Sequence, residues 1–387
     1  MTLVSVQAFG ITAPGGGPRI LRALFEGADA AVQNVCTSTS EPPRASPFAE
    51  AWIPARPAFG PLERTRAGGP LGTLETVLAR RLERRIAELC ERSGATAVHS
   101  VAHSSDVWPA FQAARRLGLP FALTVHDDMR YVLRTRPDRA LALRRLGEAW
   151  EAADHRFVIG RAIGEEYSAR YGRRPYEIVT DGLEDDEIAA RPAETEGLRM
   201  YFAGLFHRAY TDNVRQFATA MRSLAATRGL PATARFRCGK VPVELDAEAL
   251  GLTVLPFAAE DVVRDDLTTA DFAYMPLPFG EGYRDFFRYS VSTKMVKYLG
   301  SGKPIVYHGP AEGAAYEILA EHDAAILVHS LDTGDVARAL EDGLDRAGEI
   351  AANGLALARR SFRIADQRSR FWQAFAAPLS SAPSLVA

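Results

Sequence analysis

This 387-residue sequence has few cysteines and no long apolar stretch. Its three cysteines, Cys36, Cys90 and Cys238, are far apart and show no paired spacing. That pattern supports neither a disulfide framework nor a zinc site, and it fits a reducing compartment. No run of 18 apolar residues occurs, and the first residues lack the basic stretch and apolar core of a signal peptide. We therefore expect a cytoplasmic protein that does not span a membrane.

The sequence also lacks an excess of either charge. It contains 46 Lys and Arg against 48 Asp and Glu, a formal net charge of −2. Because nucleic-acid binders usually carry a strong basic excess, no nucleic-acid partner is expected. Two arginine-rich stretches are local exceptions, and they could form either a solvated helix face or a basic face toward anionic lipid. A peripheral contact with the inner face of the membrane therefore stays open, through Arg80, Arg81, Arg84, Arg85, Arg134, Arg136, Arg139, Arg144 and Arg145.

What the sequence does contain is an alternation of short apolar runs and amphipathic helical patterns, which is typical of βαβ units and a parallel sheet. The length suits two domains of about 180 residues each. We expect an α/β fold with two Rossmann-like domains in tandem. The predicted strands are 3–9, 97–101, 120–125, 155–159, 176–180, 199–203, 234–238, 252–255, 272–277, 304–307 and 324–328. The predicted helices are about 74–93, 212–228, one from about 292, 331–349 and 350–376.

The domain boundaries follow from composition. Residues 184–197 are acidic, contain a proline and lack core residues, so they predict a linker. We expect an N-terminal domain over 1–185 and a C-terminal domain over 198–360. The segment from 361 to 387 is expected to form a helix that returns toward the N-terminal domain, followed by a disordered tail. The stretch 38–72 predicts a long surface excursion with room for a short strand.

Ligands of an open parallel sheet bind beyond the carboxyl ends of the strands. The first such loop is Pro14-Gly15-Gly16-Gly17-Pro18-Arg19, ahead of a helix. Glycines let the backbone approach a ligand, and a helix N-terminus offers free amides. The loop therefore predicts ligand contact at Gly16 and Gly17, with a flexible turn as the alternative. It lacks the spacing of a dinucleotide fingerprint, so a nicotinamide cofactor is not implied.

A second candidate site follows the strand 120–125, where the sequence reads His126-Asp127-Asp128. His126 could donate a hydrogen bond to a sugar hydroxyl or to a leaving phosphate, Asp127 could orient its ring, and Asp128 could accept a proton. A solvated polar loop is the alternative. His103, just after the strand 97–101, could form a wall of the same site or make a structural contact.

The second half offers basic groups at corresponding strand ends. Arg208 follows the strand 199–203 and Lys240 the strand 234–238, and both could face a diphosphate or remain solvated. A stronger signal is Ser292, which can cap the helix that it precedes, because the amides of a capped first turn form an anion site. Lys294 would add positive charge there. This predicts a phosphate-bearing ligand at the helix start, with a capped structural helix as the alternative.

Taken in order, these segments resemble the retaining glycosyltransferases of the GT-B group, in particular family 4, over most of residues 1–376. The resemblance rests on five sequence segments. They are the glycine loop 15–17, Leu123-Thr124-Val125-His126-Asp127, Ala153-Asp154-His155-Arg156-Phe157-Val158, Tyr201-Phe202-Ala203-Gly204 and the segment Ser292-Thr293-Lys294-Met295-Val296-Lys297-Tyr298-Leu299-Gly300-Ser301-Gly302-Lys303-Pro304. The last segment is similar to the family element Ser-Lys-x-x-Glu-Tyr-Leu-Ala-x-Gly-Lys-Pro.

The resemblance implies two Rossmann-like domains facing each other across a cleft. It further implies transfer of a sugar from a UDP- or GDP-sugar to a glycan, lipid-linked or small-molecule acceptor, with retention and without a metal or other cofactor. His126 and Asp127 would be the catalytic residues, and His103 and Asp128 would lie on the acceptor side. The donor-binding residues implied in this way are Gly16, Gly17, Arg208, Lys240, Ser292, Thr293, Lys294 and Lys297.

One departure from the family pattern concerns Lys297. The family commonly has two glutamates eight positions apart, and this sequence has Tyr289 and Lys297 at those positions. A lysine donates hydrogen bonds but cannot accept them, as the second glutamate does from ribose hydroxyls. Leu205 also stands near a position where the family often has an arginine. Two alternatives therefore stay open: a non-catalytic GT-B-like binding or scaffold subunit, and an epimerase that acts on the nucleotide sugar alone.

Overall fold

The computed structural model describes residues 1–39, 42–43, 47–189 and 197–376. The chain forms two domains that we treat separately: the N-domain, Met1–Asp181 together with the segment from Ile364, and the C-domain, Gly182–Arg363. Of the expected linker 184–197, residues 190–196 lie outside the described residues, as does the tail from 377. The first part of that segment is ordered, since Asp185–Glu187 form a 3-10 helix (η2) held by a reciprocal capping box between Glu184 and Glu187.

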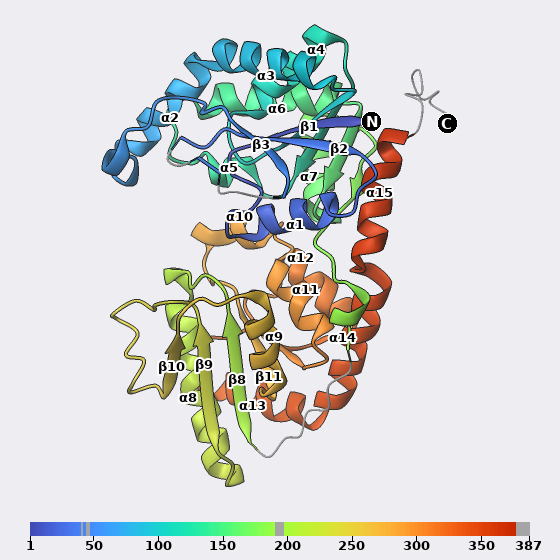
Figure 1. The fold of residues 1–387 in the computed structure, drawn as a ribbon. Coiled ribbons are helices and arrows are strands. Elements are labelled where there is room, and N and C mark those ends of the chain that lie inside the picture. Colours follow the sequence, from blue (N-terminus) through green and yellow to red (C-terminus); the bar gives the residue numbers. More distant parts are fainter. Residues whose placement is uncertain (40–41, 44–46, 190–196, 377–387) are drawn as a thin grey trace. The chain divides into compact units, whose positions relative to one another are not determined.

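The N-domain is built on a parallel sheet, which the described residues show with seven strands in the order β3-β2-β1-β4-β5-β6-β7 (Figure 1). Every pairing between neighbouring strands is parallel, as the sequence pattern predicted. The order reverses between β1 and β4, the kind of switch point at which doubly wound folds bind ligands. The strands are β1 (Thr2–Gln7), β2 (Ala31–Cys36), β3 (Ala49–Trp52), β4 (Ala97–Val101), β5 (Phe121–Val125), β6 (His155–Val158) and β7 (Glu177–Ile178).

Several helices of the N-domain are amphipathic and bury one apolar face. The helical elements of this domain are α1 (Gly16–Phe25), η1 (Gly60–Arg64), α2 (Gly68–Val77), α3 (Ala79–Ser93), α4 (Val107–Leu117), α5 (Met129–Val132), α6 (Arg139–Ala152), α7 (Arg161–Tyr171) and α15 (Ile364–Ala376). The single helix predicted over 74–93 is wrong: the chain leaves the helical conformation at Leu78, where φ is −88° and ψ is 4°, so α2 and α3 are separate. Strand β2 was missed because Gln33 and Asn34 interrupt its apolar residues, although Asn34 is buried.

Helix α15 completes the N-domain although it lies at the other end of the sequence (Figure 1). The ring of Phe371 is buried, with its centroid 4.9 Å from that of Phe157 and 5.9 Å from that of Phe25. Arg368 and Trp372 donate hydrogen bonds to the carbonyls of Ala23 and Leu24, at 2.6 and 2.9 Å. These bonds satisfy carbonyls that the last turn of α1 leaves without helical partners.

The C-domain is built on a second parallel sheet, six-stranded in the described residues, with the order β10-β9-β8-β11-β12-β13. Its strands are β8 (Leu198–Ala203), β9 (Ala232–Arg237), β10 (Leu252–Leu255), β11 (Phe272–Pro276), β12 (Ile305–His308) and β13 (Ala325–Val328). Its helical elements are η2, η3 (Arg208–Tyr210), α8 (Thr211–Arg228), α9 (Glu260–Thr268), η4 (Glu281–Tyr283), α10 (Arg284–Phe287), α11 (Thr293–Gly300), α12 (Ala314–Glu321), α13 (Thr333–Asp345) and α14 (Ala347–Ser361). The helix predicted over 350–376 is two helices, because the chain departs from helical geometry at Phe362.

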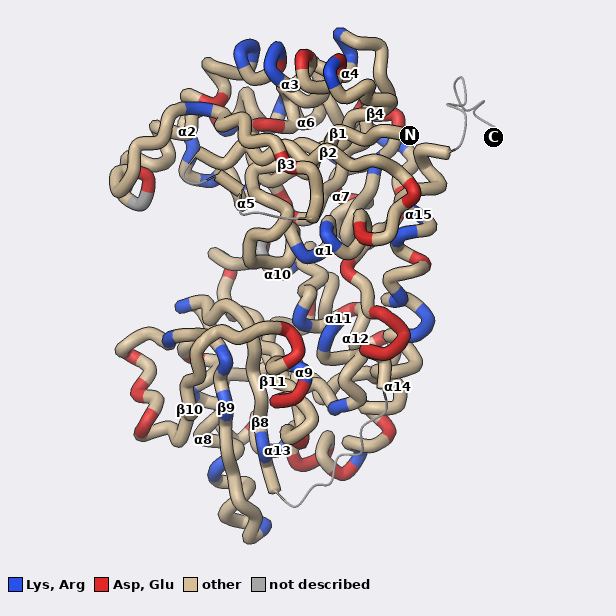
Figure 2. Tube along the Cα trace, viewed as in Figure 1, with Lys and Arg blue, Asp and Glu red and all other residues tan. Residues whose placement is uncertain are grey.

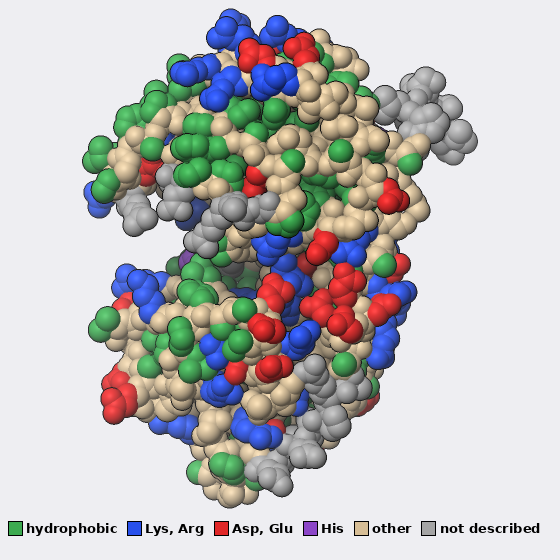
Figure 3. All heavy atoms as spheres, in the orientation of Figure 1, with side chains coloured by type: hydrophobic (Ala, Val, Ile, Leu, Met, Phe, Trp, Pro, Cys, Tyr) green, Lys and Arg blue, Asp and Glu red, His purple; other side chains and the backbone are tan. Residues whose placement is uncertain are grey.

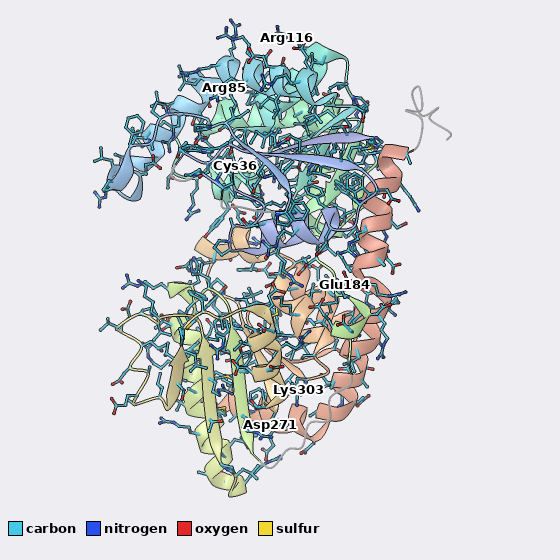
Figure 4. All side chains as sticks on the ribbon, viewed as in Figure 1. Cys36, Arg85, Arg116, Glu184, Asp271 and Lys303 are labelled. Carbon is cyan, nitrogen blue, oxygen red and sulfur yellow. The ribbon has the colours of Figure 1, made fainter. Side chains whose placement is uncertain are left out.

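Aromatic packing and an ion pair with a buried carboxylate stabilise the central strands of the C-domain. The rings of Phe217 and Tyr274 lie 4.3 Å apart between α8 and the sheet. Asp271 directly precedes β11 (Figure 4). Its buried carboxylate accepts hydrogen bonds from the backbone and guanidinium of Arg199, at 2.7 and 2.8 Å. These hydrogen bonds join the start of β8 to the start of β11.

The arginine-rich surface of the N-domain is less uniform than its sequence indicates. Basic residues lie along α3 with acidic ones among them (Figure 2), and their side chains gather on the surface at this end of the N-domain (Figure 3). Arg136 cannot belong to a free basic face, because its guanidinium is nearly buried in ion pairs with Glu75 and Asp138. Among the described residues, no helix is both long enough and apolar enough to cross a membrane.

Candidate active site

The glycine loop after β1 lies directly against a histidine. Gly15 is the N-cap of α1 and has φ of +128°, a conformation that favours glycine. A Cβ atom on Gly17 would lie 2.8 Å from Nε2 of His103 and 3.2 Å from the ring of Phe9. Only glycine therefore allows the first turn of α1 to approach His103 this closely. The loop therefore places the N-terminus of α1, with its free backbone amides, beside His103.

His103 and His126 form a pair at the ends of the neighbouring strands β4 and β5. Nδ1 of His126 lies 3.3 Å from Nε2 of His103, and their ring centroids are 5.4 Å apart. His126 is 4% exposed, and its Nε2 is buried without a hydrogen-bond partner among the described residues. Burial and the neighbouring histidines hold the pKa of His126 well below its usual range, and burial also lowers the pKa of His103. Both rings are therefore neutral near pH 7.

The two aspartates that follow His126 have different surroundings. The Asp127 side chain is 48% exposed, and its carboxylate lies 3.6 Å from Nδ1 of His103. Asp127 thus reaches His126 through His103 rather than by orienting it directly. Asp128 is buried and caps α5, accepting from the Arg130 amide at 2.9 Å and pairing with the guanidinium groups of Arg130 and Arg170. Its carboxylate is occupied by these structural donors, and an acceptor-side role for Asp128 stays a prediction.

In the C-domain, α11 begins at a capped and positively charged end. The Ser292 hydroxyl accepts a hydrogen bond from the Lys294 amide at 3.2 Å, as the sequence predicted for an N-cap. Thr293 is the first residue of this helix. The ammonium group of Lys294 lies 4.6 Å from the Phe202 ring centroid and 5.5 Å from that of Tyr210. These are cation–π distances, so the charge is held over two aromatic faces.

Residues that follow two strands, β8 and β9, lie next to Lys294. A Cβ atom on Gly204, just after β8, would lie 3.2 Å from Cδ of Lys294, and Gly204 has φ of +119°. The thiol of Cys238, just after β9, interacts electrostatically with Lys294. Burial lowers the pKa of Lys294 to about 8, because a desolvated ammonium loses hydration. The β8 and β9 loops and the start of α11 therefore form one basic site with a partly desolvated cation.

The other two basic candidates lie at the surface. The Arg208 side chain is 82% exposed and pairs with Glu244, at 2.5 Å between Nη2 and Oε1. Lys240 is exposed and follows Gly239 on the turn after β9, two residues from Cys238. The ion pair directs the Arg208 guanidinium toward Glu244. The diphosphate roles of Arg208 and Lys240 stay predictions.

Lys297, where a glutamate was expected, has a carboxylate beside it. Its Nζ lies 3.0 Å from Oε1 of Glu260, the first residue of α9. The pair lines a pocket of about 150 Å³ whose wall also includes Leu183, Glu187, Asp261, Val263, Arg264, Leu267 and Ser301. Figure 2 shows acidic residues along α9. The pocket therefore offers both a donor and an acceptor, although its acceptor comes from a helix that the sequence did not single out.

The structure thus gathers the predicted residues into two groups. Gly17, His103, His126 and Asp127 lie together in the N-domain, and Ser292, Thr293 and Lys294 lie together in the C-domain. Sequence reasoning missed the two aromatic rings under Lys294 and the carboxylate of Glu260. In the sequence, Phe202 and Tyr210 could have been recognised only by their positions, in the strand β8 and in the segment that follows it. Within the described ranges, no group of three His, Cys, Asp or Glu side chains is arranged to hold a metal ion.

Comparisons with known proteins agree with this architecture. Residues 14–187 match the family Glycosyltransferase Family 4. No curated protein sequence matches the chain. The chain is similar to a UDP-forming α,α-trehalose-phosphate synthase from Burkholderia vietnamiensis, with a TM-score of 0.68 and 13% identity, covering 97% of this chain and 100% of that one.

Two further structures of the same kind are similar. An α,α-trehalose-phosphate synthase from Burkholderia xenovorans in complex with glucose-6-phosphate has a TM-score of 0.67 and 14% identity, covering 97% of this chain and all of that one. The Escherichia coli protein bound with UDP-2-fluoro glucose has a TM-score of 0.66 and 12% identity, covering 99% and 100%. At these identities the likeness shows the fold, and the family match covers the N-terminal part. The chain therefore has the GT-B fold of these structures, and its N-terminal part, residues 14–187, matches a glycosyltransferase family.

Proposed function

We propose that this protein transfers a sugar from a UDP-sugar to a hydroxyl of a small-molecule acceptor, with retention and without a metal ion. In this reaction the bond between the anomeric carbon and the diphosphate oxygen breaks, and a bond to the acceptor oxygen forms. Negative charge grows on the departing diphosphate, whose leaving oxygen can take up the proton that the acceptor hydroxyl loses. A catalyst must above all stabilise that charge.

The observation that carries the proposal is the start of α11. Free amides of a capped helix N-terminus and the ammonium of Lys294 point to the same anion site. Lys294 is partly desolvated, and a bound diphosphate would provide the counter-charge that its surroundings lack. Helix amides and a lysine can perform the charge stabilisation that a metal ion performs elsewhere. This supports a metal-independent reaction.

In the N-domain, the His103–His126 pair supports a contact with a sugar hydroxyl. The unpartnered Nε2 of buried His126 needs a hydrogen-bonding partner. One similar solved structure is in complex with glucose-6-phosphate and another is bound with UDP-2-fluoro glucose. These ligands make glucose the first donor sugar to test and sugar phosphates the first acceptors, ahead of the glycan and lipid-linked classes. The amide end of α1 beside Gly17 could contact an acceptor or donor phosphate.

A non-catalytic binding subunit is the second candidate, and Lys297 is the observation that favours it. The lysine removes an acceptor that the family usually supplies from α11. If the protein only binds nucleotide sugars, it will bind UDP-glucose without releasing UDP in the presence of any acceptor. An epimerase would instead form product from the nucleotide sugar alone.

The test begins with thermal shifts against UDP, GDP, ADP and their glucose conjugates, since a ligand raises the melting temperature by mass action. The expected result is a larger shift with UDP and UDP-glucose than with the GDP or ADP series. UDP release is then measured against a panel of sugar phosphates, with and without EDTA. Nuclear magnetic resonance of the product's anomeric proton determines retention. Absence of binding and turnover across the panel would contradict the proposal.

A further inference from the structure

Three side chains at the ends of β4 and β5 form a row: Asp127, His103 and His126. We propose that Asp127 and His103 are positioning residues that fix the tautomer of His126, so that its Nε2 carries a lone pair and accepts a hydrogen bond from a substrate hydroxyl. The identity of the hydroxyl as that of a sugar rests on the proposed function. The tautomer itself follows from the N-domain alone.

The first step is the contact between Asp127 and His103. An ionised carboxylate only accepts hydrogen bonds, and its oxygen lies 3.6 Å from Nδ1 of His103. At this distance the interaction is electrostatic rather than a short hydrogen bond, and it favours the tautomer whose N–H faces the carboxylate. His103 is neutral because it is buried, so its single proton is on Nδ1 and its Nε2 has a lone pair.

The second step passes this preference to His126. Nδ1 of His126 lies 3.3 Å from the lone pair on Nε2 of His103, so a hydrogen bond between them requires the proton on Nδ1 of His126. His126 is also neutral, since burial and the nearby His99 and His103 disfavour its charged form. Its Nε2 therefore has no proton. The ring can accept a hydrogen bond there and cannot donate one.

The third step is the environment of that nitrogen. Nε2 of His126 is buried and has no partner in the described residues, whereas buried polar atoms are nearly always hydrogen-bonded. A lone pair attracts an O–H donor and repels a carboxylate or a deprotonated phosphate oxygen. The sequence predicted that His126 donates to a hydroxyl or a phosphate; the row instead makes its Nε2 an acceptor, which favours a contact with a hydroxyl over a contact with a phosphate.

The row is held in place by its neighbours. His103 packs edge-on against Phe9, with ring centroids 5.2 Å apart, and against the backbone of Gly17. His99, whose two ring nitrogens face the hydroxyls of Ser5 and Thr124 at 2.7 and 2.8 Å, is a further titratable group near His126. His99 is occupied by these hydroxyls, so Asp127 is the group that decides which nitrogen of His103 carries the proton.

The test is nitrogen-15 nuclear magnetic resonance of the ligand-free protein at pH 7.5, with the histidine side chains assigned by single substitutions. The expected wild-type spectrum shows His126 with a protonated Nδ1 and a lone pair on Nε2. A spectrum with the proton on Nε2 of His126 would overturn the proposal. Because no ligand is added, this result does not depend on whether nucleotide sugars bind.

The variant Asp127→Ala tests the origin of the preference. Its side chain is half exposed, so the fold is expected to persist, while His103 loses the group that selects its tautomer. The expected result is that His126 changes from one dominant tautomer to a mixture of both. Asp29→Ala, which removes an exposed carboxylate of the same domain, is the matched control and should leave the spectrum unchanged. An unchanged His126 in Asp127→Ala would show that Asp127 has no such role.

His103 is tested by two variants. His103→Gln keeps a carbonyl that can accept from Nδ1 of His126, so the wild-type tautomer of His126 should be retained, whereas His103→Leu should lose it. If His103→Leu does not fold, the wild-type and Asp127→Ala spectra still decide the proposal. A UDP-glucose titration then separates the two conclusions: the expected tautomer without any binding would leave the row intact and contradict the proposed function alone.

Discussion

The ammonium group of Lys297 lies 3.0 Å from the carboxylate of Glu260, so a carboxylate of α9 lies beside the position at which the family pattern has a glutamate on α11. The pair lines a pocket of about 150 Å³, where a diol could donate to Glu260 and accept from Lys297. If this pocket holds the nucleotide ribose, Glu260→Ala and Lys297→Ala should each raise the Kd for UDP about tenfold, the effect of losing one charged hydrogen bond. Calorimetry measures both.

The matched control for this pair is Asp265→Ala, which removes an exposed carboxylate of α9 that does not line the pocket. It should leave the Kd unchanged. In the double variant, the two effects should be less than additive because the residues act as a pair. Unchanged affinity in both single variants would place Lys297 and Glu260 outside the nucleotide site.

Gly17 tests how closely the loop after β1 must approach His103. In Gly17→Ala, the new Cβ would lie 2.8 Å from Nε2 of a histidine that is held by His126 and Phe9. We expect destabilisation of about 1–3 kcal/mol from overpacking. Thermal unfolding followed by circular dichroism measures it. The control is Gly348→Ala in α14, where no atom lies within 4 Å of the added methyl group and a small gain in stability is expected.

Asp127 and Asp128 are adjacent, but we expect their replacement to change the stability of the N-domain by very different amounts. Asp128→Ala removes the cap of α5 and the partner of Arg130 and Arg170, and we expect it to destabilise the N-domain by about 2 kcal/mol. Asp127→Ala should change stability by less than about 0.5 kcal/mol, since its side chain is half exposed. Equal losses of stability in the two variants would contradict these assignments.

Tryptophan fluorescence suits this comparison, because it reports the unfolding of the N-domain in urea without a signal from the C-domain. All four tryptophans belong to the N-domain: Trp52, Trp108, Trp150 and Trp372.

Because the pKa of Lys294 is lowered, we expect diphosphate binding to depend on pH. Burial lowers its pKa to about 8, and a bound anion would raise that pKa again. Binding above pH 8 should therefore take up a proton, and the affinity for UDP should fall about tenfold between pH 7 and pH 9. Calorimetry in buffers of different ionisation enthalpy measures the uptake. Uridine, which lacks the phosphates, should show none, and Lys294→Met should abolish it. Equal heats in all buffers would show that Lys294 does not contact the anion.

The sequence by itself determined the fold class and the positions of most strands. Alternating apolar runs and helical periods are local patterns, so they survive without knowledge of the tertiary structure. The glycines of the loop at 15–17, the N-cap Ser292 and the histidines after β4 and β5 were visible for the same reason. Breaks at Leu78 and Phe362 were not visible, because apolar residues continue the helical period across both.

Only the tertiary structure decided which of these residues meet. Strands β4 and β5 lie side by side and parallel, so residues 23 positions apart, His103 and His126, come into contact. Glu260 reaches Lys297 from a different helix, and Asp128 is occupied by arginines rather than free. These contacts depend on strand order and helix packing, which join distant parts of the chain. Local patterns cannot encode them, and it is these contacts that determine whether each polar residue has a structural or a chemical role.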